Sequence, residues 1–437
     1  MPPLSNPLPS VAVLADDLTS AGDGAAPFRR TGHEARILFS EPAVADLRTP
    51  GVTAVDLGTR LLEEAEAADR TRQAASMFMG CDVVLKTVDS TLRGHLAAEI
   101  RAAWAGSGRR AVVVAPAFPA QGRVTAGGVQ YVHGVPVDQS DFAHDPVHPV
   151  TCADLAVLLP EAVLVEPDRA DGLPRPIADG RLIVCSASTD EELDRFVRAV
   201  PRLDQVLWVG SPGLAAALAR RCALRVAPPT PTPEAEPESE QELEPARRPL
   251  VVVGSANPAS RRQLAVLHSR ADADGTCVTE DPGEALAAVR RLNTEVLTLR
   301  TPDERHDAAT AQALAASLAA TVRVLADEHT VDALVITGGE TAATVFQALG
   351  ATGITLIDEP EPGVARGTLL GGHPLPVLVK AGGFGDDGTL LRLCHLAGHP
   401  LDRGENGPAE NSPAENGRRD NDRGDNDRGN NRRGANP

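Results

Sequence analysis

The feature that most constrains the fold is a repeated alternation of short, continuous apolar runs with longer helix-like segments. The runs lack the polar residue at every second position that marks a half-exposed strand, so they predict strands buried on both faces. Strands that alternate with helices are typical of mostly parallel sheets covered by helices. We therefore expect an α/β protein. The predicted strands are VAVLADD, ARILFS, VTAVDL, DVVLKTVD, AVVVAPA, RLIVCSA and QVLWVGS in the first half, and PLVVVGS, EVLTLRT, ALVITGGE and PVLVKAG in the second. The clearest predicted helices are 61–79, 190–200, 260–269 and 308–326.

Two stretches interrupt or end this pattern. Residues 227–248 are rich in proline and glutamate and predict an extended, self-repelling linker. Residues 401–437 offer almost no apolar surface to offset the entropy lost on ordering, so we expect a disordered tail. The sequence thus predicts two domains, residues 1–226 and 249–400, each a mostly parallel sheet flanked by helices.

The charge balance narrows the class of partner. The chain carries 42 basic and 60 acidic residues, a net charge of −18, whereas nucleic acids and anionic membranes require a basic face. The apolar runs are strand-sized, and the N-terminal MPPLSNPLPS lacks the pattern of a signal peptide. The six cysteines form no CxxC pair, so we expect reduced thiols and no metal bound by the protein. A cytoplasmic protein with a small-molecule partner fits these observations.

Only two of the 42 basic residues are lysines, Lys86 and Lys380. Each follows an apolar run and precedes a polar or glycine-rich turn. Because an ammonium is a compact point charge and a guanidinium a wide planar fork, a tight anion pocket is one reason to retain a lysine. The alternative is that both are chance survivors at exposed strand ends.

Polar side chains follow several predicted strands of the first half, where ligands bind in parallel α/β sheets. Asp16 and Asp17 follow the first strand, and either one is also a natural cap for the next helix. VDLGTR contributes Arg60, and the turn PAFPAQGR contributes Arg123, a candidate clamp for a carboxylate.

The stretch KTVDSTLRG is denser in chemistry. It combines Lys86, Asp89, Ser90 and Arg93 just before a helix. Arg93 can bind a carboxylate through two N–H groups, and Asp89 can accept a hydrogen bond from an alcohol or deprotonate it. This set suits a polyhydroxylated acid, although a capped helix start with a Lys–Asp pair is the simpler alternative.

The second half carries three glycine-containing turns after strands, GSANPAS, TGGET and KAGGFG. Glycines let backbone N–H groups approach phosphate oxygens, and a helix N-terminus favours their negative charge. The candidate nucleotide-binding residues are Ser255, Gly338, Gly339, Glu340, Thr341, Gly382 and Gly383. The chain has no GxxxxGK[ST], no HRD or DFG motif and no GxGxxG, so P-loop, protein-kinase and dehydrogenase classes are disfavoured.

Taken in order, ADDLTSAGD, KTVDSTLRG, PAFPAQGR, GSANPASRRQ, TGGETAATV and LVKAGGFG resemble the motifs of the four-carbon acid sugar kinases, over residues 11–396. The resemblance implies a sugar-acid domain followed by a nucleotide domain, an active site in the interdomain cleft, and ATP- and Mg²⁺-dependent phosphorylation in carbohydrate-acid catabolism. By motif, the substrate pocket would be lined by Asp17, Arg60, Lys86, Asp89, Ser90 and Arg93, and ATP would be held by Ser255, residues 338–341 and Gly382. STLRG is closer to the threonate and erythronate branch than to the 3-oxo-tetronate branch. GSANPAS, KAGGFG and His95 depart from the family pattern.

We hypothesise in-line transfer of a phosphoryl group to a substrate hydroxyl. Asp89 or Asp17 would orient or deprotonate that hydroxyl, and the sequence does not choose between them. Lys380 would hold phosphates, making it the third catalytic candidate. A 3-oxo-tetronate kinase and a non-catalytic sugar-acid sensor are the alternatives, and a homodimer is left open.

Overall fold

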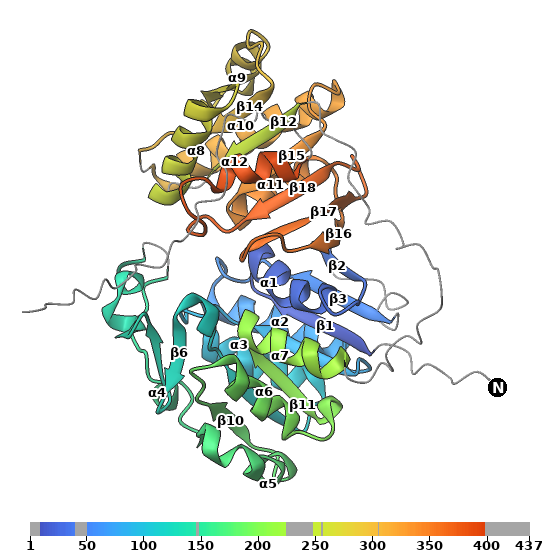
Figure 1. The fold of residues 1–437 in the computed structure, drawn as a ribbon, viewed down its shortest axis with the longest axis vertical. Helices are drawn as coiled ribbons and strands as arrows, with labels where there is room; N and C mark the ends of the chain where they lie inside the picture. The colour runs from blue at the N-terminus through green and yellow to red at the C-terminus, as the bar shows by residue number, and fades with distance from the viewer. Residues whose placement is uncertain are drawn as a thin grey trace, which may run out of the picture. The chain divides into compact units, whose positions relative to one another are not determined.

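The structure is a computed structural model that describes residues 9–39, 50–145, 148–223, 248–254, 257–304 and 306–397. The predicted tail and all of the predicted linker except Arg248 lie outside the described residues. The described part of the chain forms one compact unit, in which two α/β halves share a sheet (Figure 1).

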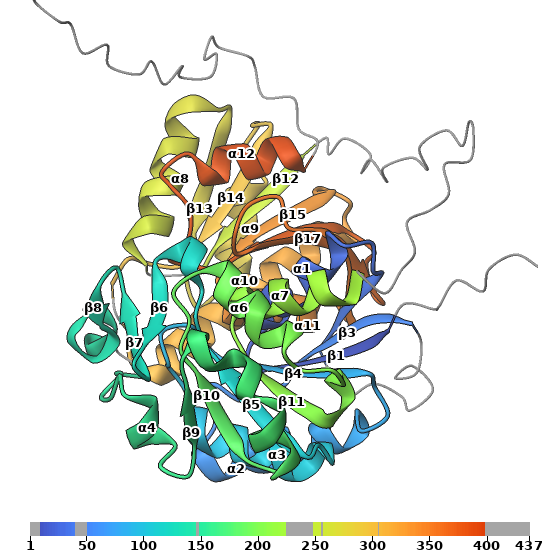
Figure 2. The ribbon, with the colours of Figure 1, turned by 60° about the horizontal axis from the view of Figure 1, so that its bottom comes forward.

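The first half is a parallel sheet in the order β2-β3-β1-β4-β11-β5-β10-β9. Its strands are β1 (Ser10–Ala15), β2 (Ala35–Leu38), β3 (Gly51–Asp56), β4 (Val83–Thr87), β5 (Ala111–Ala115), β9 (Val163–Val165), β10 (Leu182–Cys185) and β11 (Val206–Gly210). Its helices are α1 (Leu18–Arg29), α2 (Glu64–Met77), α3 (Leu96–Ser107), α4 (Leu155–Leu158), α5 (Pro174–Ala178), α6 (Asp190–Arg198) and α7 (Pro212–Ala223). Helices α2 and α3 pack against each other, as do α1 and α7, and Figure 2 shows the two pairs on opposite sides of the strands.

A small antiparallel sheet lies beside the first half (Figure 2). It consists of β6 (Arg123–Ala126), β7 (Val129–Val132) and β8 (Val135–Pro136). It follows β5 through the single 3₁₀ turn Pro119–Gln121, in which Gly122 adopts φ 65°. This geometry confirms the tight turn predicted around Arg123.

The second half continues the same large sheet with β13-β14-β12-β15-β18-β17-β16. Its strands are β12 (Pro249–Val253), β13 (Ala273–Cys277), β14 (Val296–Arg300), β15 (Ala333–Thr337), β16 (Gly353–Asp358), β17 (Val364–Leu370) and β18 (Pro376–Lys380). Its helices are α8 (Pro258–Arg270), α9 (Pro282–Val289), α10 (Ala308–Asp327), α11 (Gly339–Ala348) and α12 (Thr389–Leu396). Strands β13, β14, β12, β15 and β18 are parallel, and β17 and β16 are antiparallel to their neighbours.

The two halves are joined by backbone hydrogen bonding between β16 and β2, with Leu356 opposite Ala35 and Gly353 opposite Leu38. Over the described residues the predicted pair of separate sheets is therefore a single sheet of 15 strands. The class is as predicted, α/β with mostly parallel strands. Helix α1 contacts β2 and β3 on one side of the joint and β16 and β17 on the other, so the main hydrophobic core extends across both halves.

Every strand predicted from a continuous apolar run is present, and the predicted helices agree to within a few residues. The strands not predicted include β16 and β17, whose residues alternate between buried and partly exposed. Antiparallel strands with one solvated face carry this weaker signal.

Helix α10 is the one described helix whose length and apolar composition would allow it to cross a membrane. Its apolar face, including Leu318, Val322 and Leu325, is buried in the core. The burial explains the composition of this helix.

Candidate functional site

Three neighbouring parallel strands of the first half bring polar side chains to one edge. In the central part of the sheet, Ala15 of β1 lies opposite Asp56 of β3, and Leu14 lies opposite Lys86 of β4. The residues that follow these strands therefore meet at the carboxyl edge, where ligands bind in such folds.

Arg60 links the turns after β1 and β3. Its Nε donates to Asp16 Oδ2 at 2.8 Å, Nη1 donates to Asp17, and Nη2 donates to Ser20 Oγ at 3.0 Å. Asp17 is also the N-cap of α1, since its Oδ1 accepts from the Ser20 backbone N–H at 2.7 Å. Burial acts to raise the pKa of Asp16, but Arg60 and then Lys86 outweigh it, and the pKa is lowered.

A second network follows β4. Asp89 Oδ2 accepts hydrogen bonds from Thr91 Oγ1 and Arg93 Nε, and Arg93 Nη1 donates to Asp145 at 3.3 Å. Burial acts to raise the pKa of Asp89, but Arg93 and Arg60 hold it well below its usual range, so the carboxylate stays ionised. Leu92 between them adopts φ 62°, a left-handed conformation that is uncommon for a leucine and is held by these contacts.

Ser90 adjoins this network and is 7% exposed. Its carbonyl oxygen accepts from Gln130 Nε2 of β7 at 2.8 Å, and Gln130 Oε1 accepts from Thr125 Oγ1 of β6 at 2.6 Å. The small sheet therefore supports the backbone of the STLRG turn.

Lys86 lies beneath this edge in a buried ion pair. Its side chain is 0% exposed, its Nζ lies 3.0 Å from Glu99 Oε2 on α3, and it donates to the Thr87 carbonyl oxygen at 2.8 Å. Its charge lowers the pKa of Asp16, and its role as a substrate-pocket residue stays a prediction. The sequence interpretation overlooked Glu99, although it lies in the same stretch, KTVDSTLRGHLAAEI.

Arg123 differs from the other arginines of this edge. Its Nε and Nη1 are buried and have no hydrogen-bond partner among the described residues, and its guanidinium lies over the Phe384 ring, 5.3 Å from the centroid. Burial lowers the pKa of Arg123, and the charge of Asp89 is the largest effect that opposes this shift. An anionic ligand would supply the missing acceptors.

The second half presents its own carboxyl edge. Val253 of β12, Thr337 of β15 and Lys380 of β18 lie in one register row, and each strand is followed by a glycine-containing turn. The predicted turns are therefore brought together. Gly338 adopts φ 93° at the N-cap of α11 and provides no capping side chain, which leaves backbone N–H groups of the first helical turn available.

The Gly254 backbone packs directly on Thr341, because a Cβ at Gly254 would lie 2.1 Å from Thr341 Oγ1. A Cβ at Gly383 would similarly lie 3.2 Å from Asn257 Nδ2. The predicted residue Ser255 lies outside the described residues.

Lys380 is bonded within its own loop. Its Nζ donates to the carbonyl oxygens of Ala381, Gly382 and Phe384 at 2.8, 3.1 and 2.9 Å, and the side chain is 0% exposed. Burial lowers the pKa of Lys380 to about 8. A compact ammonium group with three donors suits this position. The predicted role of Lys380 in holding phosphates stays a prediction.

The two edges meet at the turn that begins α11. A Cβ at Gly339 would lie 3.3 Å from Thr19 Cγ2 on α1. Charges of the first half act on Glu340, in the first turn of α11: desolvation and then Asp17 raise its pKa, and Arg60 opposes them. The glycine-containing turn 338–341 and the polar edge of the first half are therefore neighbours.

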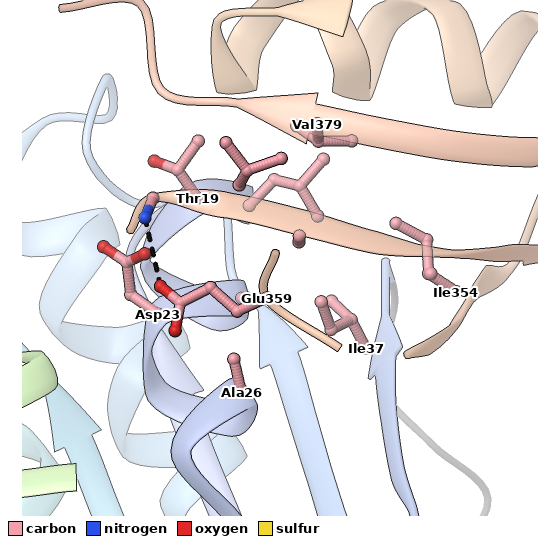
Figure 3. A pocket seen from close by; sticks show the side chains of 12 residues that line it. Thr19, Asp23, Ala26, Ile37, Ile354, Glu359 and Val379 are labelled. Carbon is pink, nitrogen blue, oxygen red and sulfur yellow. Dashed lines mark hydrogen bonds between the residues drawn. The ribbon is translucent and has the colours of Figure 1, made fainter. Parts of the chain in front are cut away.

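A pocket of about 310 Å³, including space open to solvent, lies beside this meeting point between α1 and β16–β18 (Figure 3). It is mostly apolar, and the carboxyl groups of Asp23 and Glu359 face each other within it. Glu359 accepts from the Gly363 backbone N–H at 3.0 Å and forms an ion pair with Arg30. Burial and then Glu359 raise the pKa of Asp23 well above its usual value.

The second edge fits a nucleotide triphosphate. The open helix N-terminus at Gly338 and the buried Thr337 Oγ1, which has no hydrogen-bond partner among the described residues, are suited to phosphate oxygens. Within the described residues no group of three or more His, Cys, Asp or Glu side chains is arranged to hold a metal ion. Mg²⁺ bound with a nucleotide takes most of its ligands from phosphates and water, so a preformed protein cage is not needed.

The fold and its two edges define a protein with a sugar-binding and a nucleotide-binding half. Residues 11–218 match a family model described as a sugar-binding N-terminal domain, and residues 250–390 match one described as a nucleotide-binding C-terminal domain. These matches give the ligand class of each half of the chain.

The chain belongs to the four-carbon acid sugar kinase family, whose members phosphorylate four-carbon sugar acids. It is 36% identical to a D-threonate kinase of Bordetella bronchiseptica, covering 88% of this chain and 96% of that protein. It is 29% identical to a D-erythronate kinase of Heliobacterium modesticaldum, covering 86% of this chain and 94% of that protein. A crystal structure named for a tRNA synthase of Salmonella typhimurium LT2 aligns with a TM-score of 0.71 and 22% identity over 88% and 98% of the two chains, a likeness that shows the fold alone.

Several residues of the site were not singled out from the sequence: Asp23, Gln130, Asp145, Glu359 and Phe384. Asp23 and Phe384 lie inside quoted motifs, so their neighbours were a usable signal. Asp23 and Glu359 are 336 positions apart by number, and only the β16–β2 joint brings their segments together.

Proposed function

We propose that this protein is an ATP-dependent kinase that phosphorylates D-threonate in the cytoplasm. The D-threonate assignment is supported by the 36% identity to a D-threonate kinase and by the STLRG form of the turn after β4. The main structural support for this site is the close approach of Gly339 to Thr19. It brings the glycine-containing turn 338–341 next to the polar edge of the first half.

The sugar acid would lie against the edge formed by Asp17, Arg60, Asp89 and Arg93. Asp89 would orient the attacking hydroxyl by accepting its hydrogen bond. Its lowered pKa makes it a weak base, and this fits a reaction in which positioning and charge neutralisation matter more than deprotonation. Asp17 would position Arg60, because both of its carboxylate oxygens already accept hydrogen bonds.

ATP would lie along the turns of Gly254, Gly338 to Thr341, and Gly382 to Gly383, with backbone N–H groups directed at phosphate oxygens. Mg²⁺, when bound, would bridge phosphate oxygens and neutralise their charge. Lys380 would act indirectly, by fixing the carbonyl groups of its loop and so the direction in which its N–H groups point.

The test is an ADP-release assay with Mg²⁺ and ATP against D-threonate, L-threonate, D-erythronate and 3-oxo-tetronates. The highest kcat/KM is expected for D-threonate. A clear preference for a 3-oxo-tetronate would overturn the substrate assignment. Calorimetric binding of D-threonate with no ATP consumption would instead favour a non-catalytic sensor.

The Asp89 assignment has its own test. Asp89→Asn should lower kcat because a neutral amide is a poorer acceptor for the attacking hydroxyl. Asp17→Asn should mainly raise KM, since it loosens Arg60. Near-normal turnover in Asp89→Asn would remove Asp89 from the reaction.

A further inference from the structure

Arg123 is the first residue of β6, at the end of the turn that follows β5. Two of its nitrogens, Nε and Nη1, are buried and have no hydrogen-bond partner within the described part of the chain. A buried guanidinium with unsatisfied donors is unfavourable by itself, so it is usually retained where an anion completes it.

The surroundings of Arg123 come from both halves of the molecule. Its guanidinium stacks on Phe384, which lies in the glycine-rich loop after β18. The charged groups that act on it are Asp89 and Arg93 of the polar edge and Asp23 of α1, all in the first half. Arg123 therefore lies between the polar edge of the first half and the glycine-containing turns of the second half.

The other cations described at the two edges already have protein acceptors. Arg60 donates to two carboxylates and a hydroxyl, and Arg93 to two carboxylates. Lys86 pairs with Glu99, and Lys380 donates to three carbonyl oxygens. Arg123 thus has the free donors that an incoming anion requires.

Resting on the proposed function, we propose that Arg123 is a catalytic residue that binds the γ-phosphoryl group while it passes from ATP to the sugar acid. In this step a P–O bond forms to the substrate hydroxyl oxygen and the bond between the γ-phosphorus and the β–γ bridging oxygen breaks. The electron pair leaves with ADP, and the hydroxyl proton passes to solvent or to the phosphoryl oxygens. Arg123 stabilises the negative charge spread over the transferring group.

Two observations favour the phosphoryl group over the substrate carboxylate, for which the sequence made Arg123 a candidate clamp. First, Asp89 is the carboxylate that acts most strongly on the charge of Arg123, and the hydroxyl that Asp89 orients must be in line with the incoming phosphorus. Second, the stacking on Phe384 ties the guanidinium to the nucleotide side. Both place its free donors where the two substrates react.

The experiment compares Arg123→Gln and Arg123→Lys with the wild type. For Arg123→Gln we expect kcat to fall by about 100- to 1000-fold, the usual cost of removing one donor to a transition-state oxyanion. The calorimetric affinity for D-threonate without nucleotide should stay within about threefold, because a group that acts on the phosphoryl does not touch the free acid. Guanidinium ion should restore part of the activity of Arg123→Ala.

The matched control is Arg202→Gln, an exposed arginine paired with Asp204, which should leave kcat unchanged. Native tryptophan fluorescence of each variant establishes that it is folded, and the lysine variant keeps a positive charge if the glutamine variant does not fold.

The opposite pattern would overturn the proposal. A tenfold or greater loss of D-threonate affinity with kcat retained at saturation would make Arg123 a carboxylate clamp. Unchanged kcat and affinity would make it a structural residue. If the wild type turns over no four-carbon acid, the proposed function is wrong and this role of Arg123 is wrong with it. If the wild type is active and Arg123→Gln is equally active, only the role of Arg123 is wrong.

Discussion

The buried pair of Lys86 and Glu99 allows a quantitative test of whether Lys86 is a structural residue or a substrate contact. The two side chains are 0% and 4% exposed, and their charged atoms are 3.0 Å apart. At an effective dielectric constant of about 20, this separation corresponds to an attraction of about 5 kcal/mol. Removing one partner leaves the other charge buried and unpaired, which typically costs about 3–5 kcal/mol of unfolding free energy.

We expect Lys86→Met and Glu99→Gln each to lower the free energy of unfolding by about 3–5 kcal/mol. The double variant Lys86→Met/Glu99→Gln should lose far less than the sum, because replacing both partners by neutral side chains removes two desolvated charges. The coupling energy from this cycle should therefore exceed about 2 kcal/mol.

Urea unfolding followed by tryptophan fluorescence suits this measurement, because the chain has two tryptophans, Trp104 and Trp208. Trp104 lies on α3 with Glu99, and Trp208 on β11 lies opposite Leu85 of β4. Lys380→Met is the control, since it removes the other lysine and should be additive with Glu99→Gln. If Lys86→Met kept full stability and lost D-threonate binding, Lys86 would be a substrate contact after all and our reasoning would be refuted.

Three further predictions follow from the two edges. Gly254→Ala should raise the calorimetric Kd for ATP at least tenfold and leave the D-threonate Kd unchanged, because its Cβ would collide with Thr341; equal affinity for ATP would contradict the close approach. Burial raises the pKa of Asp56 to about 7, so the folded state binds the proton more tightly than the unfolded chain and stability should decline as pH rises from about 4 through 7. Asp56→Asn should flatten that decline in the midpoint of thermal unfolding, and an unchanged profile would count against the shift. The pKa of Asp23 is raised by burial and by Glu359, with Asp17 and Asp89 adding to the effect and Arg123 opposing it. Asp23→Asn should therefore raise the midpoint of thermal unfolding more at pH 8 than at pH 4. A larger gain at pH 4 would contradict the direction of this pKa shift.

Many residues of the candidate site could be predicted from the sequence because, in parallel α/β folds, the residues that bind ligands directly follow the strands. A continuous apolar run predicts a buried strand, and the residues after it belong to the edge where ligands bind. Asp89, Arg93 and the 338–341 turn were predicted in this way, within single βα units, and the structure places each of them after the carboxyl end of a strand.

The two lysines show what such local sequence patterns do not predict, namely which groups a buried charge contacts. Composition indicated that Lys86 and Lys380 are retained for a compact charge, and both are indeed buried with short contacts. Which group receives that charge depends on the helix face or loop that folds over the strand end. A strand pattern carries no information about that packing.

The sequence by itself determined the α/β class, the positions of the strands predicted from apolar runs, and the two sets of polar turns, since each depends on residues close together in the chain. Only the tertiary structure decided that β16 joins β2, that Thr19 meets Gly339, and that Arg123 keeps free donors. These features arise from contacts between segments hundreds of residues apart. Whether a buried donor is satisfied depends on every segment that packs around it, and therefore on the completed fold.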